Sequence, residues 1–381
     1  MDFELHGQHR GLIALAAGGT GGHLFPAQAL AEELVRRGFI VMLFTDARGR
    51  KYGDRFPAVD IVQVSSSTLT FRKPWKLPFQ AMRLLKGYSE ARLRLGRNRP
   101  AAIIGFGGYP SFPPLLAASR MGIPSAVHEQ NAVMGRANRA VAKNVDVIAS
   151  SFPEIVNLSP ALKRKVVFTG NPVRKAVLEM ASAPYEPPGE TGTFELLVFG
   201  GSQGAHFFSE LMPKVLRGLP ETLRGNLHVT QQCRPEDIEE VRRAYASLGV
   251  NATLETFFSD MPERMARAHL VISRAGASTV AELAVVGRPA ILVPLPHALD
   301  DDQLMNARAF SRAGAGWVFK QDAIRPDQLA MFITKLRYEP ETLRAAHGAA
   351  RHFARPDAAQ RLADVMERLV AQGTARGRKS T

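Results

Sequence analysis

Short runs of aliphatic and β-branched residues alternate with longer amphipathic segments along the first half of the chain. The short runs predict strands at 12–17, 39–44, 61–64, 101–105, 124–127, 145–149 and 166–169. Helical spacing of hydrophobic residues predicts helices at 24–37, 79–95, 111–121 and 134–143. This alternation is typical of a mostly parallel sheet with helices on both faces.

The pattern stops at 181–192, a segment with three prolines, two glycines and no periodicity, which predicts a linker. Beyond it, strands are predicted at 194–199, 227–231, 252–256, 269–272, 289–293 and 316–319, and helices at 205–217 and 355–371. We therefore predict an α/β protein of two Rossmann-like, doubly wound parallel-sheet domains, at 1–180 and 193–354. The C-terminal helix at about 355–371 is expected to pack back on the first domain.

The two halves open alike, with a strand, a glycine loop and a helix, at Gly18–Gly22 and again at Gly200–Gly204. Two such domains would face each other across a cleft, with ligands at the carboxyl ends of the strands. Glycine there lets backbone N–H groups approach a phosphate, and the following helix adds oriented donors. Neither loop fits G-x-G-x-x-G or a Walker A loop, so a tight structural turn is an equal alternative at this point.

A third glycine segment, SRAGASTVAEL at 273–283, follows the strand predicted at 269–272. Ser278 or Thr279 could cap the next helix, and Glu282 would lie about one turn inside it. A carboxylate in that position can accept hydrogen bonds from a ribose diol. The alternative is that Glu282 is only a favourable charge near a helix N-terminus.

The charge balance bears on the kind of partner, because 49 basic and 35 acidic side chains give a net charge of +14. Such a surplus indicates an anionic partner, which could be nucleic acid, anionic lipid or a phosphorylated substrate. The single cysteine, Cys233, excludes an internal disulfide and fits a reducing cytosol. No stretch approaches the ~18 apolar residues of a membrane helix, so we expect a protein that does not cross the membrane.

Much of this charge lies between Arg72 and Arg99, where nine basic residues stand against one acid, Glu90. Aromatic and aliphatic residues are interleaved with them, as on a surface that settles into anionic lipid headgroups. The leucines and methionines of the segment are expected to face the core instead. The residues predicted to contact the membrane are Phe71, Lys73, Trp75 and Lys76.

Seven segments, in order, carry a family resemblance: 18–27 (GGTGGHLFPA), 105–110 (GFGGYP), 128–131 (HEQN), 170–174 (GNPVR), 200–205 (GGSQGA), 274–282 (RAGASTVAE) and the spaced residues of 296–307. Together they resemble the MurG family, the UDP-N-acetylglucosamine–N-acetylmuramyl-(pentapeptide) pyrophosphoryl-undecaprenol N-acetylglucosaminyltransferases of glycosyltransferase family 28. The resemblance runs from about residue 11 to about residue 365. It implies the two-domain GT-B fold, inversion of the anomeric centre, and no cofactor or essential metal.

The resemblance also implies a reaction: N-acetylglucosamine moves from UDP-N-acetylglucosamine to the 4-hydroxyl of undecaprenyl-pyrophosphoryl-MurNAc-pentapeptide, turning lipid I into lipid II. That step belongs to peptidoglycan synthesis and so to cell wall biogenesis, cell shape, cell division and the cell cycle. It implies a peripheral enzyme on the cytoplasmic face of the bacterial inner membrane, with cell-wall synthesis and division proteins as partners and no nucleic acid. A glycolipid glycosyltransferase or a UDP-N-acetylglucosamine 2-epimerase is the alternative, which segments 105–110 and 128–131 argue against.

Site residues carried over by matching motif positions fall into two groups. Those expected around UDP-N-acetylglucosamine are Thr20, Gly21, Gly22, Asn131, Arg174, Ser202, Phe258, Ala277, Ser278, Thr279, Val280, Ala281, Glu282 and Gln303. Those expected around the acceptor pyrophosphate are Gly107, Gly108 and Tyr109. Phe258 departs from the family, which usually has a smaller aliphatic residue there.

Inverting transfer needs a base for the attacking hydroxyl, and His23 is the first candidate because an imidazole titrates near working pH. A helix N-terminus favours neutral imidazole, so His23 could instead bind an acceptor phosphate. Glu129 is the alternative base, and His128 is expected to be a structural histidine at a strand end.

The leaving diphosphate is expected to be neutralised by Ser202, the Gly200–Gly204 backbone and Arg174 rather than by a metal. Asp300 and Asp302 spell D-x-D, a pattern that elsewhere holds a divalent ion, but here an acidic loop near the sugar is the preferred interpretation.

Two other classes share parts of this pattern. A nicotinamide oxidoreductase would use an acid near Asp46, but the chain lacks its glycine fingerprint. A nucleic-acid-binding protein would explain the charge, but no RRM, KH, zinc or helix-turn-helix signature is present.

Overall fold

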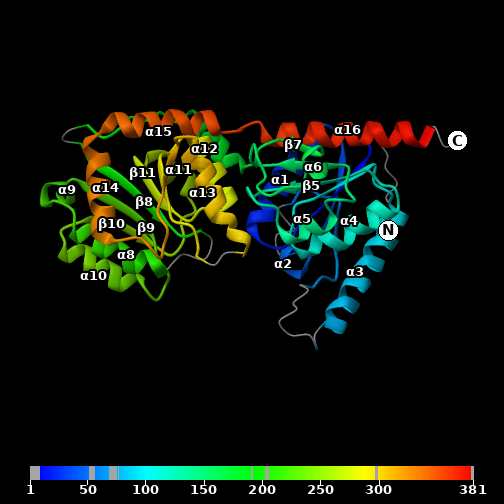
Figure 1. Ribbon diagram of the computed structural model, residues 1–381, viewed down its shortest axis with the longest axis horizontal. Coiled ribbons are helices and arrows are strands. Elements are labelled where there is room, and N and C mark those ends of the chain that lie inside the picture. Colours follow the sequence, from blue (N-terminus) through cyan, green and yellow to red (C-terminus); the bar gives the residue numbers. More distant parts are fainter. Residues whose placement is uncertain are drawn as a thin grey trace. The chain divides into compact units, whose positions relative to one another are not determined.

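The computed structural model describes residues 9–50, 56–67, 75, 77–189, 192–201, 206–296 and 299–378 (Figure 1). They divide into two compact units, the first from residues 1–174 with 357–381 and the second from 175–356. Each unit holds one parallel sheet covered by helices, so the predicted α/β fold with two parallel-sheet domains is confirmed.

The first sheet has the strand order β3-β2-β1-β4-β5-β6-β7 and is parallel throughout. Its strands are β1 (Leu12–Ala16), β2 (Ile40–Thr45), β3 (Asp60–Gln63), β4 (Ala102–Gly105), β5 (Ser125–Glu129), β6 (Val147–Ser150) and β7 (Val166–Phe168). Its helices are α1 (Gly21–Arg36), α2 (Ala47–Arg50), α3 (Leu77–Arg97), η3 (Tyr109–Ser111), α4 (Phe112–Arg120), α5 (Arg136–Val141), α6 (Pro160–Lys163) and α16 (Ala358–Arg378).

Side-chain alternation along β1 shows how this sheet is buried on both faces. Ile13 and Leu15 pack with residues of α1 and α16 on one face. Ala14 and Ala16 pack with residues of α3, α4 and α5 on the other. Arg37 also pairs with Asp364 of α16 at 2.6 Å, so the C-terminal helix is held to the first unit by both apolar and ionic contacts.

The second sheet is parallel too, with the order β10-β9-β8-β11-β12-β13. Its strands are β8 (Phe194–Phe199), β9 (Leu227–Gln232), β10 (Asn251–Glu255), β11 (Leu270–Ser273), β12 (Ala290–Leu292) and β13 (Gly316–Val318). Its helices are α7 (Lys175–Glu179), η4 (Met180–Ser182), α8 (His206–Arg217), α9 (Glu221–Gly225), α10 (Ile238–Ser247), α11 (Met261–Arg267), α12 (Ala277–Val286), η5 (Leu299–Asp301), α13 (Asp302–Arg312), α14 (Pro326–Tyr338) and α15 (Pro340–Phe353).

The proline-rich segment that precedes β8 lies against the second unit. The Tyr185 hydroxyl donates to the His269 carbonyl oxygen at 2.9 Å, and the Tyr185 ring stacks on His347 with 4.6 Å between centroids. The fully buried Arg288 donates to the Pro184 carbonyl oxygen at 3.1 Å. These contacts hold residues 184 and 185 in place on the second unit.

Helix α3 has a packed second half and an exposed first half. Ala91 and Leu95 are fully buried, whereas Phe79, Met82 and Leu85 are 58%, 60% and 67% exposed. In Figure 1 the first half of α3 extends beyond the other elements of its unit. The expectation that the methionines and leucines of this segment face the core is therefore wrong for Met82 and Leu85, and also for Leu93 in the second half of the helix, which is 59% exposed.

Candidate functional site

The loops that follow β1, β4, β5 and β7 meet at the carboxyl edge of the first sheet. Gly18 N–H donates to the Gly107 carbonyl oxygen at 3.2 Å, which joins the first two loops. The Gln130 side chain donates to the Phe106 carbonyl oxygen at 2.8 Å, and His128 Nε2 lies 3.0 Å from the Gly170 carbonyl oxygen. The parallel topology thus brings the segments at 18–27, 105–110, 128–131 and 170–174 together.

His23 is the third residue of α1 and packs against the glycine loop after β4. A Cβ on Gly108 would lie 3.0 Å from His23 Cδ2, and one on Gly107 would lie 3.4 Å from His23 Nε2. Gly107 and Gly108 have positive φ, of 82° and 72° respectively, which other residues rarely adopt. A side chain at position 108 would press on the imidazole and on the Gly18 backbone, whereas at position 107 the positive φ is what disfavours one.

The surroundings of His23 keep its ring neutral. Burial, aided by the nearby positive charge of Arg48, lowers the pKa of His23 to about 4. Nδ1 is buried and has no hydrogen-bond partner among the described residues. The ring is therefore free to accept a proton at pH 7, but the low pKa makes it a weaker base than a free imidazole.

Glu129, the alternative base, is buried, and both of its carboxylate oxygens accept hydrogen bonds. Its Oε1 accepts the Asn131 N–H at 3.0 Å, and its Oε2 accepts the Gly135 N–H at 2.9 Å and the Asn138 side-chain amide at 2.8 Å. Burial raises the pKa of Glu129 although these three hydrogen bonds favour the carboxylate. The carboxylate shapes the loop after β5, and this geometry favours His23 over Glu129 as the base.

The other first-unit residues predicted around the donor and the acceptor lie around the same edge, with Gly21 and Gly22 as the first residues of α1. Thr20 is the exposed N-cap of α1 and makes no capping hydrogen bond with its side chain. Asn131 is partly exposed, and Tyr109 begins η3. The Arg174 guanidinium lies over the Phe25 ring, 5.3 Å from its centroid.

At the carboxyl edge of the second sheet, a buried arginine holds the turn after β11. Arg274 Nη1 donates to the Val293 and Pro294 carbonyl oxygens at 3.1 and 3.3 Å, and Nη2 donates to Gln321 Oε1 at 2.6 Å. The Asn306 side chain donates to the Ala275 carbonyl oxygen at 3.1 Å. Residues 274–276 are thereby fixed to the loops after β12 and β13.

Helix α12 starts from this turn with an open first turn. Its N-cap is Gly276, with no side-chain capping bond, so the expectation that Ser278 or Thr279 caps the helix is wrong. Both residues lie inside the first turn, whose N–H groups have no partner within the helix. Ala277–Glu282 therefore presents oriented donors followed, in the second turn, by the half-buried carboxylate of Glu282.

The acidic run at the start of α13 combines two exposed residues of positive φ, Asp300 and Asp301, with the half-buried Asp302. Asp300 and Asp301 have φ of 60° and 54°, and burial together with their charges raises the pKa of Asp302. Gln303 Oε1 accepts the Leu295 N–H at 3.0 Å. Within the described ranges, no group of three or more His, Cys, Asp or Glu side chains is placed to hold a metal ion.

Two further predicted positions complete the second unit. Phe258 is buried, and the Arg264 guanidinium lies 4.3 Å from its ring centroid. Ser202 lies outside the described residues.

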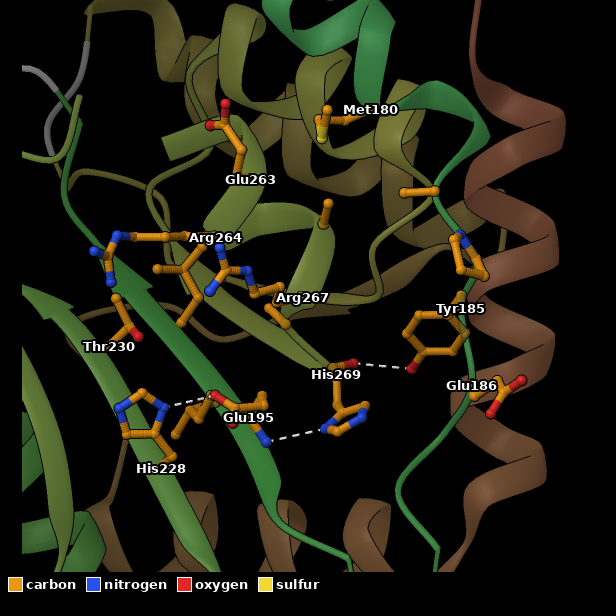
Figure 2. A pocket seen from close by; sticks show the side chains of 16 residues that line it. Met180, Tyr185, Glu186, Glu195, His228, Thr230, Glu263, Arg264, Arg267 and His269 are labelled. Carbon is orange, nitrogen blue, oxygen red and sulfur yellow. Dashed lines mark hydrogen bonds and ion pairs between the residues drawn. The ribbon is translucent and has the colours of Figure 1, made fainter. Parts of the chain in front are cut away.

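A pocket of about 680 Å³ opens elsewhere on the second unit, near the amino ends of β8, β9 and β11 (Figure 2). His228 Nδ1 lies 2.7 Å from Glu195 Oε2, and the Glu195 N–H donates to His269 Nδ1 at 2.9 Å. None of the site residues predicted from the sequence lines it. The carboxyl edges, where the predicted residues lie, and not this pocket are taken as the candidate site.

The residues expected to contact substrate were predicted from the sequence, but the residues whose side chains fix the loops of the site were not. Gln130 stands inside the HEQN motif and Arg274 inside the RAGASTVAE motif, so a signal for both was present. Asn138 lies in a weakly periodic segment and carried no signal. Its side chain reaches Glu129 only because α5 packs beside β5.

Models of two domains match the chain, the glycosyltransferase family 28 N-terminal domain at residues 13–150 and the family 28 C-terminal domain at 195–362. Two relatives share the name UDP-N-acetylglucosamine–N-acetylmuramyl-(pentapeptide) pyrophosphoryl-undecaprenol N-acetylglucosamine transferase. That of Paramagnetospirillum magneticum is 52% identical over 94% of this chain and 97% of its own length. That of Mesorhizobium japonicum is 50% identical over 96% and 97%.

Among solved structures, MurG of Acinetobacter baumannii is similar with a TM-score of 0.76 and 31% identity, over 94% of this chain and 99% of its own. The UDP-GlcNAc 2-epimerase of Neisseria meningitidis has a TM-score of 0.67 at 13% identity, over 94% and 100%, a likeness of fold alone. The chain belongs to glycosyltransferase family 28.

Proposed function

We propose that this chain transfers N-acetylglucosamine from UDP-N-acetylglucosamine to the 4-hydroxyl of undecaprenyl-pyrophosphoryl-MurNAc-pentapeptide, with inversion at the anomeric carbon. The observation that carries the proposal is the identity of about half of all residues, over nearly the full chain, to relatives named for this transfer. Both halves of the chain also match the family domains in order.

The donor binds mainly to the second unit in this proposal. The open first turn of α12 faces oxygen atoms of the sugar nucleotide, and Glu282 accepts hydrogen bonds from its ribose. Arg274 supports this arrangement because it fixes the turn from which the helix starts. Arg174, Ser202 and the second glycine loop neutralise the leaving diphosphate.

The chemistry of the acceptor belongs to the first unit. His23 takes the proton from the attacking 4-hydroxyl, which forms the new glycosidic bond while UDP leaves with the electron pair of the old one. Its neutral ring supports this role. Gly107, Gly108 and Tyr109 receive the acceptor pyrophosphate through backbone N–H groups and the Tyr109 hydroxyl.

The exposed half of α3 is proposed to dock on the anionic, cytoplasmic face of the inner membrane. No helix in the described part of the chain is long and apolar enough to cross a membrane. Trp75, Phe79, Met82 and Leu85 are more than half exposed, and the Arg83 guanidinium lies 5.8 Å from the Phe79 ring centroid. Apolar side chains mixed with cations suit an interface of headgroups and acyl chains. Phe71, Lys73 and Lys76, also predicted to take part, lie outside the described residues.

The proposal is tested by UDP release. Purified protein is mixed with UDP-N-acetylglucosamine and a short-chain lipid-linked muramyl-pentapeptide, and UDP is followed by a coupled assay. Release should depend on the acceptor. Conversion of the donor to UDP-N-acetylmannosamine or to free N-acetylmannosamine, equally with and without acceptor, would indicate the epimerase alternative. Neither acceptor-dependent UDP release nor an epimerised sugar would reject both.

A further inference from the structure

A series of buried hydrogen bonds joins three loops at the carboxyl edge of the first sheet. The side-chain amide of Gln130 donates to the Phe106 carbonyl oxygen at 2.8 Å and lies 3.2 Å from His128 Nδ1. Across the imidazole, Nε2 lies 3.0 Å from the Gly170 carbonyl oxygen. The ends of β4, β5 and β7 are linked through these two side chains.

The chemistry of the groups assigns each proton in this series. The NH₂ group of Gln130 can only donate, so His128 Nδ1 accepts, and Nε2 carries the hydrogen that goes to Gly170. Burial lowers the pKa of His128 to about 4, which keeps the ring in this neutral form. His128 is 0% exposed and Gln130 is 4% exposed, so water cannot replace the bonds.

The bonded carbonyl groups belong to residues beside the proposed reaction. Phe106 directly precedes Gly107 and Gly108, the two glycines in contact with His23. Gly170, with φ of +84°, begins the 170–174 segment that ends at Arg174.

We infer that Gln130 and His128 are positioning residues of the transfer reaction, which hold the 106–108 loop against His23 and fix it relative to the 170–174 segment. The inference rests on the proposed function. A misplacement of about 1 Å at a reacting group can cost on the order of 100-fold in rate. Most donor contacts in the proposal belong to the second unit and are not touched, so any loss of donor affinity through Asn131 or Arg174 should be much smaller than the loss of kcat.

The test replaces Gln130 by methionine, which keeps the length of the side chain and removes both donated hydrogen bonds. Gln372→Met, at an exposed position of α16, is the matched control. We expect Gln130→Met to lower kcat by ~10–100-fold with a donor Kd within about twofold of the wild-type value. The acid limb of the kcat–pH profile should also move to higher pH, because water admitted by a loosened loop relieves the desolvation of His23 beside Arg48 and His128.

Two results would overturn the inference: unchanged kcat with an unchanged acid limb, or a parallel loss of donor affinity and thermal stability. If Gln130→Met does not fold, the inference is tested by comparing kcat of His128→Gln with kcat of His128→Leu. Glutamine can still accept from Gln130 and donate to Gly170, so it should keep at least about ten times the kcat of the leucine variant. Equal kcat for these two variants contradicts the inference.

Failure of the proposed function is distinguishable from failure of this inference. A wild-type protein that releases no UDP contradicts the proposed function. An active wild type with an equally active Gln130→Met variant contradicts only the positioning role.

Discussion

The carboxyl edges of the two sheets have the same architecture but are held by different chemistry. In the first unit, neutral groups and one carboxylate tie the loops together through His128, Gln130 and Glu129. In the second, one buried guanidinium, that of Arg274, binds carbonyl groups of neighbouring loops and leaves the first turn of α12 open. The difference suggests that the first unit binds the acceptor and carries out proton transfer, whereas the second binds an anionic nucleotide.

The largest expected effect comes from His23→Ala, which removes the proposed base from the first unit. We expect kcat to fall by ~10²–10⁴-fold, with the Kd for UDP-N-acetylglucosamine within about twofold of wild type by titration calorimetry. His352→Ala, at an exposed histidine of α15, serves as the control. A loss of donor affinity equal to the loss of kcat would contradict the assignment of proton transfer to the first unit and of nucleotide binding to the second.

Acid should weaken the first unit through His128. Its folded pKa of about 4 lies below the ordinary 6.5, so the unfolded chain takes up the proton first. Its contribution to stability is complete above pH 6.5 and is lost as the pH falls toward 4, by on the order of 2–3 kcal/mol at pH 4.5.

Hydrogen exchange of β5, corrected for the intrinsic rate, measures this loss. His128→Gln should show a weaker pH dependence between pH 6.5 and 4.5. An identical dependence in both proteins would mean that His128 does not titrate as the structure indicates.

The double variant Phe79→Glu, Met82→Glu probes the membrane side of the first unit. Removing two exposed apolar side chains from the interface should lower partitioning onto anionic vesicles by ~10–100-fold. Met331→Glu places a carboxylate at a similarly exposed position of the second unit and should leave vesicle binding unchanged. Equal effects of the two would count against docking through α3.

Glu282→Gln tests the donor side. Loss of a charged acceptor for the ribose should raise the donor Kd by about tenfold while kcat at saturation changes little. Glu341→Gln, at an exposed carboxylate of α15, controls for charge. A lower kcat with unaltered donor Kd would contradict the assignment of Glu282 to the nucleotide site.

The smallest effect is predicted for metal removal. Excess EDTA should leave activity intact, because backbone donors and Arg174 neutralise the diphosphate in this account. Complete loss of activity that Mg²⁺ restores would assign the Asp300–Asp302 run a metal-binding role.

The strands were the most predictable part of the structure. Short aliphatic and β-branched runs located every strand in the described part of the chain, and 194–199 coincides with β8, whose residues are buried except for the half-buried Glu195. Helices α10, α11, α13, α14 and α15 were not predicted. Their amphipathic patterns are interrupted by charged residues, and their stability comes from packing on the sheet.

Motifs located the residues that touch ligands in our proposal, but not the contacts that hold them. The three donors to Glu129 come from residues two, six and nine positions along the chain, in a loop whose path no periodicity reveals. Arg274 reaches Gln321, 47 residues away, only through the order of the strands. Such contacts depend on tertiary structure and leave no local pattern.

The most direct test of the central claim is a product balance. Wild-type protein is incubated with labelled UDP-N-acetylglucosamine and lipid-linked muramyl-pentapeptide, and UDP and glycosylated lipid are measured together. We expect UDP and the β-linked lipid disaccharide to appear in equal amounts, and both to be lost in His23→Ala. UDP release without labelled lipid, or an α-linked product, would contradict it.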